Sequence, residues 1–117
     1  MKAEDRLQIA VAEYLDLALP SDALWFHPAN GGSRNVREAA KLKRMGVKPG
    51  VPDICIVWRG RAIFIELKTA TGRMSNVQTE MARALILAGA VFTVCRSVDE
   101  VSDFLAGAVN MKGRVAA

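Results

Sequence analysis

The 117-residue sequence lacks the features of membrane-spanning, secreted and repeat proteins. It contains no apolar run near the roughly 18 residues that suggest a membrane-spanning helix. Its first residues, MKAEDRLQIAVAEY, are charged and amphipathic and lack the apolar segment of a signal peptide. Internal repeats and low-complexity tracts are also absent. We therefore expect one domain, residues 1–117, of a cytoplasmic protein that has no membrane partner.

Cysteine and histidine are scarce, with two residues of the first and one of the second. Cys55 and Cys95 lie in apolar, strand-like runs without the spacing of metal ligands. We interpret both as buried thiols, with a disulfide or redox role as the alternative. The one histidine, His27, follows a short apolar segment, where a hydrogen-bonded structural role is the ordinary interpretation.

The charge balance is positive, at +4, and the basic residues are unevenly distributed. Between Arg34 and Lys48 there is one acidic residue, Glu38. A solvated helix face explains such a cluster, and so does contact with a phosphate backbone, because an acidic motif follows directly. The basic cluster consists of Arg34, Arg37, Lys41, Lys43, Arg44 and Lys48.

Hydrophobic periodicity predicts the order helix, strand, helix, strand, strand, helix, strand, helix. The third helix is expected to begin with Ser75 or Asn76 as its cap, and the fourth with Ser97. This order predicts a three-layer α/β domain with a mixed sheet flanked by helices. The helices are expected near residues 3–19, 36–46, 76–89 and 98–109, and the strands at 24–27, 53–58, 61–67 and 90–96.

The segment GVPDICIVWRGRAIFIELK, residues 50–68, predicts a hairpin that gathers charged groups. If Arg59 and Gly60 form a two-residue turn, Asp53 lies opposite Glu66. Side chains alternate between the faces of a strand, so Lys68 shares the face of Glu66. A register shift of one residue would separate the two acids.

Two carboxylates held this close repel each other, so a positive charge must offset them. A salt-bridge cluster with Lys68 is one solution. The other is a divalent cation such as Mg²⁺, which takes one or two carboxylates together with waters and phosphate oxygens. In that case Lys68 orients water or stabilises phosphate charge, and the group of residues performs metal-assisted phosphodiester hydrolysis.

The motifs GVPD at 50–53 and IELK at 65–68 resemble the core of PD-(D/E)XK nucleases. More narrowly, nearly the whole chain resembles the virus-type replication-repair nuclease (VRR-NUC) domain of the stand-alone phage and bacterial type. Further motifs carry this resemblance: HPANGG at 27–32, KxxGVKPGVPD at 43–53, ELKTATGRMSNVQ at 66–78 and GAVFTVCRS at 89–97.

The resemblance implies a restriction-endonuclease-like fold and a nuclease that needs Mg²⁺ or Mn²⁺. It implies that Asp53, Glu66 and the backbone carbonyl of Leu67 bind the metal and that Lys68 is the catalytic lysine. Glu13 matches the acidic position that the first helix of such nucleases brings to the metal, although a surface glutamate is common on such a helix. Gln78 matches a glutamine beside the site, although it is also an ordinary polar residue at a helix start.

The resemblance also bears on DNA. It favours a role at the site for His27. Asn30, Gly31 and Gly32 are expected to form either a tight turn or a loop whose N–H groups approach a phosphate. Members that consist of this domain alone resemble homodimeric endonucleases acting on branched DNA such as Holliday junctions. The alternative is a non-catalytic nucleic-acid-binding module that retains the fold.

Overall fold

A computed structural model of the chain describes residues 1–29 and 35–112. Its elements follow the predicted order, which is therefore confirmed. The two hairpin strands begin and end within a residue of the expected positions, and Ser75 and Ser97 cap the third and fourth helices as expected. The elements are α1 (Ala3–Ala18), β1 (Ala23–Phe26), α2 (Val36–Arg44), β2 (Ile54–Trp58), β3 (Arg61–Leu67), α3 (Asn76–Leu87), β4 (Val91–Cys95) and α4 (Val98–Ala106).

The hairpin of β2 and β3 has the predicted register. Trp58 pairs with Arg61, and the ladder continues to the pair of Ile54 and Ile65. The two turn residues, Arg59 and Gly60, both have positive φ, at 48° and 77°. This backbone matches the right-handed twist of the flanking strands, which explains the tight turn.

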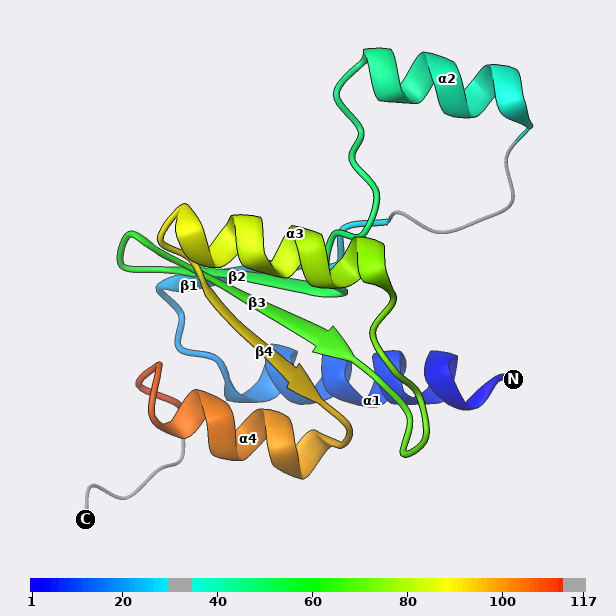
Figure 1. Cartoon of the computed structure of the whole chain (residues 1–117). Helices are drawn as coiled ribbons and strands as arrows, with labels where there is room; N and C mark the ends of the chain where they lie inside the picture. Colours follow the sequence, from blue (N-terminus) through cyan, green and yellow to red (C-terminus); the bar gives the residue numbers. More distant parts are fainter. Residues whose placement is uncertain (30–34, 113–117) are drawn as a thin grey trace.

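The four strands form one mixed sheet in the order β1-β2-β3-β4. The pairs β1–β2 and β2–β3 are antiparallel, whereas β3 and β4 are parallel and are connected through α3. Helices α1 and α4 cover one face of the sheet and α3 lies on the other (Figure 1). The predicted three-layer α/β fold is thus confirmed.

The hydrophobic core lies between the sheet and the pair α1 and α4. Alternate residues of β2 and β3 point to this side and are buried, as the strand period requires. From the helices, Val11 and Leu15 of α1 and Val101 and Leu105 of α4 are completely buried against them. Cys55 and Cys95 are buried, unbridged thiols, as predicted.

Helix α2 stands away from the other helices and from the sheet (Figure 1). Asn35 caps it by accepting a hydrogen bond from the backbone N–H of Glu38. None of its residues is buried. Among the described residues, no helix is long and apolar enough to cross a membrane.

Candidate active site

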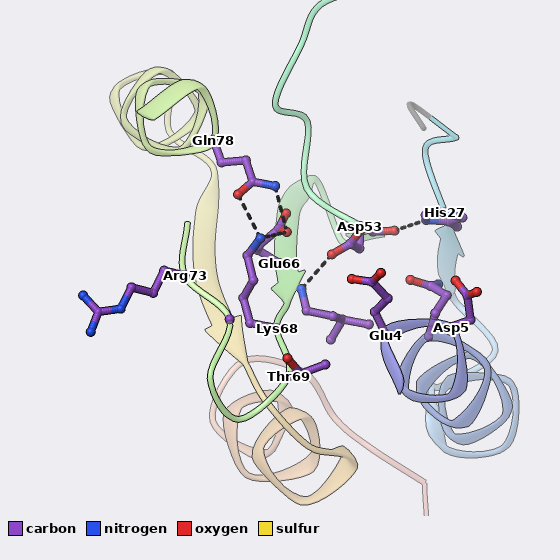
Figure 2. Close-up of a pocket in the computed structure, with 12 residues that line it drawn as sticks. Glu4, Asp5, His27, Asp53, Glu66, Lys68, Thr69, Arg73 and Gln78 are labelled. Carbon is purple, nitrogen blue, oxygen red and sulfur yellow. Dashed lines mark hydrogen bonds and ion pairs between the residues drawn. The ribbon is translucent and has the colours of Figure 1, made fainter. Parts of the chain in front are cut away.

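The charged residues of the hairpin meet where β2 begins and β3 ends. Asp53 immediately precedes β2, Glu66 is the next-to-last residue of β3, and Lys68 follows that strand. Oδ2 of Asp53 accepts a hydrogen bond of 2.8 Å from the backbone N–H of Leu67. This bond holds the Asp53 carboxylate at the end of β3, beside Glu66 (Figure 2).

Three side chains form a closed triangle of polar contacts at this point. The ammonium Nζ of Lys68 lies 3.3 Å from Oε2 of Glu66 and donates a 2.9 Å hydrogen bond to Oε1 of Gln78. Nε2 of Gln78 donates to the same Glu66 oxygen at 3.3 Å. Gln78 lies in the first turn of α3, so this helix is joined directly to the strand that carries the acid and the lysine.

Among the described residues, Glu66 is the only charged one that is buried, with 3% of its surface exposed. Burial and the neighbouring Asp53 carboxylate raise the pKa of Glu66 from 4.5 to about 7, although Lys68 acts in the opposite direction. The ion pair with Lys68 therefore does not fully compensate the two acids. No ion pair of Asp53 is found within the described ranges. The centre favours an additional positive charge.

A cavity of about 490 Å³ opens over these groups. Glu4 and Asp5, in the first turn of α1, extend toward the side that holds Asp53 and His27 (Figure 2). Arg73 extends away from the carboxylates. The lining consists of Glu4, Asp5, Gln8, His27, Asp53, Glu66, Leu67, Lys68, Thr69, Gly72, Arg73 and Gln78.

Glu13, expected from the resemblance to reach the metal, is exposed and does not line this cavity. Val11 and Leu15 face the core, and Glu13 lies two residues from each, on the opposite side of the helix. Glu4 precedes Val11 by seven residues and so shares its stripe. That spacing is a signal in the sequence, because it places Glu4 on the same side of α1 as Val11. Glu4 and Asp5 are the acids of α1 that line the cavity.

His27 holds the backbone at the centre. Its Nδ1 lies 2.6 Å from the carbonyl oxygen of Asp53, and because a carbonyl only accepts, Nδ1 carries the hydrogen. This bond joins the residue that follows β1 to the residue that precedes β2. His27 also lines a second hollow of about 300 Å³ beside Asp53, Glu66 and Gln78. The histidine is therefore both a structural residue and part of the rim.

The loop after Lys68 is held by a residue that sequence reasoning missed. Nη1 of Arg96 donates hydrogen bonds to the carbonyl oxygens of Thr69, at 2.6 Å, and Gly72, at 2.8 Å. Arg96 directly follows β4, so it fixes the loop to the edge of the sheet. The motif that contains it gave no reason to connect it with the loop, because the two are distant in sequence.

The basic residues lie on a different part of the molecule. Lys43 and Lys48 line a hollow of about 410 Å³ beneath α2, together with apolar residues such as Leu42 and Val47. Arg37, Lys41 and Arg44 are exposed on α2. Four residues predicted to contact DNA, Asn30, Gly31, Gly32 and Arg34, lie outside the described residues.

The donor set suits a hard cation. The described part of the chain holds no group of three or more His, Cys, Asp or Glu side chains arranged for a metal. It does bring two carboxylates, Asp53 and Glu66, into one cavity that Leu67 also lines. Mg²⁺ binds through one or two carboxylates and keeps several waters, so these residues fit such an ion.

The chain is similar to known proteins in both sequence and fold. The VRR-NUC domain family model matches residues 6–99. A solved structure described as a VRR-NUC domain protein is 25% identical, with a TM-score of 0.68, and the alignment covers 92% of this chain and 88% of that one. A second, a VRR-NUC domain, shares the fold at 19% identity and a TM-score of 0.61, covering 91% and 97%. No curated protein sequence matches the chain.

Proposed function

Because the chain belongs to the VRR-NUC domain family, which implies a nuclease-type function in the PD-(D/E)XK superfamily, we propose that it is a metal-dependent DNA endonuclease. The observation that carries the proposal is the pairing of Asp53 and Glu66 in one cavity beside Lys68. The raised pKa of Glu66 indicates a centre with too little positive charge of its own. A divalent cation and a DNA phosphate suit such a centre together.

Asp53, Glu66 and the carbonyl of Leu67 would hold Mg²⁺ or Mn²⁺, and Glu4 is the acid of α1 best placed to assist. When bound, such an ion supplies Lewis acidity and lowers the pKa of a coordinated water. Lys68 has a separate task. Its ammonium, fixed by Glu66 and Gln78, stabilises negative charge on the phosphate or orients the attacking water.

Contact with the DNA backbone is assigned to the basic residues of and around α2. Arg37, Lys41, Lys43, Arg44 and Lys48 are exposed or line the hollow beneath the helix, and Arg34 precedes it in sequence. Phosphate contacts of this kind position DNA without reading its sequence. His27, on the cavity rim, is the contact closest to the carboxylates, and Asn30, Gly31 and Gly32 follow it in the chain.

We further propose that the active form is a homodimer that cuts branched DNA. The face of β1 and β2 not covered by α1 and α4 leaves Leu24 66%, Phe26 48% and Val57 42% exposed. Leu24 and Val57 are directly paired across the strands, so these side chains form a continuous apolar patch. A two-fold dimer would have two active sites, which suits paired nicks in a four-way junction.

The experiment compares cleavage of supercoiled plasmid and a labelled four-way junction with Mg²⁺, with Mn²⁺ and with EDTA. Asp53→Asn and Lys68→Met should each lower the cleavage rate at least about a thousandfold, because each removes a group at the reacting phosphate. Both variants should still bind the junction. Asp103→Asn, which changes an exposed acid of α4, is the matched control and should cut normally.

Cleavage that persists in EDTA would contradict the metal requirement. Cleavage retained by both Asp53→Asn and Lys68→Met would contradict the assignment of the site. Binding of the junction without any cleavage by the wild type would favour the non-catalytic binding module instead.

A further inference from the structure

The first turn of α3 is tied to the candidate active site through its own cap. Oγ of Ser75 accepts a hydrogen bond of 3.2 Å from the backbone N–H of Gln78. In return, the backbone N–H of Ser75 donates 2.9 Å to Oε1 of Gln78. This reciprocal pair is a capping box. Oε1 is the same oxygen that accepts from Lys68.

The cap therefore controls where the Gln78 amide lies. Its oxygen is shared between the Ser75 N–H and the Lys68 ammonium, and its Nε2 points at Glu66. Ser75 is anchored in turn, because its carbonyl oxygen accepts 3.0 Å from the hydroxyl of Thr79 as well as from its N–H. The Gln78 amide is therefore bonded both to the start of α3, through Ser75, and to the site, through Lys68 and Glu66.

We propose that Ser75 is a positioning residue of the nuclease, acting through Gln78 to hold the Lys68 ammonium in its working place. The inference rests on the proposed function. It assigns a task in the reaction to a residue that does not line the cavity. The capping box thus stabilises the helix through the Ser75 hydroxyl, and the backbone N–H of Ser75, which the cap holds in place, orients the Gln78 amide.

The chemistry of an amide explains why Gln78 occupies this position. Capping boxes accept either Glu or Gln at the third helical residue. Asn35 and Ser97 cap α2 and α4, and the corresponding residues there are glutamates, Glu38 and Glu100. At α3 a glutamate would add a carboxylate beside Glu66, which is already buried next to Asp53. Gln78 instead donates to Glu66 and accepts from Lys68.

Ser97 supplies a matched control for the experiment. It caps α4 with the same bond, its Oγ accepting 3.1 Å from the backbone N–H of Glu100, and neither residue lines the cavity. Ser75→Ala and Ser97→Ala should lower the Tm by similar amounts, because each removes one serine cap. Ser75→Thr keeps the hydroxyl and should behave as the wild type.

Three measurements separate positioning from stability. Ser75→Ala should lower the single-turnover cleavage rate at saturating plasmid about tenfold, with half-saturation by DNA unchanged, since misplaced groups lose rate rather than binding. Ser97→Ala should stay within about twofold of the wild type. In ¹⁵N–¹H spectra, the Gln78 side-chain NH₂ signal, assigned by its loss in Gln78→Glu, should move in Ser75→Ala and return in Ser75→Thr.

Equal losses of rate in Ser75→Ala and Ser97→Ala would overturn the inference, because the cap would then act through stability alone. An unmoved Gln78 signal in Ser75→Ala would overturn it as well. If the wild type itself cleaves no DNA, the proposed function fails. The Gln78 signal then decides by itself whether Ser75 orients the amide.

Discussion

The two faces of the sheet are built differently. On the face covered by α1 and α4, Ile54, Ile56, Ile63 and Ile65 are completely buried. On the opposite face, Ala82 is the one buried residue that α3 contributes. Large apolar side chains of β1 and β2 remain exposed there.

Because of this difference, one face of the sheet stabilises the fold and the other carries the charged groups of the candidate active site. The α1 and α4 face is the hydrophobic core, which supplies most of the apolar burial. The α3 face carries Glu66, a buried acid whose raised pKa costs stability, together with its partners Lys68 and Gln78. A rigid core on one side allows the other to hold groups that repel each other.

The largest expected effect comes from breaking the core face. Ile56→Ala should lower the free energy of unfolding by about 4 kcal/mol, because it leaves a cavity among fully buried side chains. Val57→Ala is the control, since Val57 is the next residue of β2 but points to the other face and is 42% exposed. It should cost less than about 1 kcal/mol. Urea unfolding measures both, and equal losses would contradict the distinction between the faces.

The hairpin and its paired acids could be predicted because both depend on local rules. A two-residue turn at Arg59 and Gly60 fixes the register, and the strand period then places Asp53, Glu66 and Lys68 together. The rotation of α1 depends on tertiary packing of Val11 and Leu15 on the sheet. The apolar pattern identified the helix and carried the spacing that sets Glu4 with Val11, but which acids line the cavity depends on that packing. The contact of Arg96 with the loop at 69–72 was out of reach for the same reason.

The second effect concerns the pH dependence of the site face. The folded pKa of Glu66, about 7, exceeds its ordinary value of 4.5. The folded state therefore binds a proton between these values that the unfolded state releases, and stability falls as pH rises through this window. The full difference corresponds to roughly 3 kcal/mol. Below about pH 4.5 the burial of Glu66 costs little, and above about pH 7 it costs most.

Glu66→Gln isolates this contribution from the other acids. Compared with the wild type, the variant should gain stability as pH rises from about 5 to about 8. Adding Mg²⁺ near pH 8 should raise the Tm of the wild type and leave that of Glu66→Gln unchanged, because a ligand stabilises only the state that binds it. A wild type whose Tm ignores both Mg²⁺ and Mn²⁺ would contradict the metal assignment.

The third effect concerns the close contact between Gly50, in the loop before β2, and Val77, at the start of α3. The φ of Gly50 is +80°, and an added Cβ would lie 2.7 Å from the backbone oxygen of Val77. Gly50→Ala should therefore cost about 3 kcal/mol and lower cleavage, since the strained loop continues into Asp53. Gly89→Ala is the control: its φ is +98°, but nothing lies within 4 Å of the added atom. It should cost about 1 kcal/mol, and equal costs would contradict a role for the close contact.

The smallest effect on folding, and the sharpest on assembly, is expected at the exposed apolar patch. Leu24→Lys places a charge on a side chain that is 66% exposed, so the free energy of unfolding of the monomer should change by less than about 0.5 kcal/mol. If the patch joins two copies, the variant should be monomeric in sedimentation velocity while the wild type is dimeric, because a charge in an apolar interface is left without a partner.

Leu87→Lys, at the end of α3, is the matched surface control, since Leu87 is 91% exposed and lies outside the patch. It should leave the dimer intact. A monomeric Leu24→Lys that still nicks plasmid but no longer cuts both strands of a four-way junction would connect the apolar patch to paired cleavage. A wild type that sediments as a monomer, or a dimer that survives Leu24→Lys, would show that the incompletely covered face of the sheet does not join two copies.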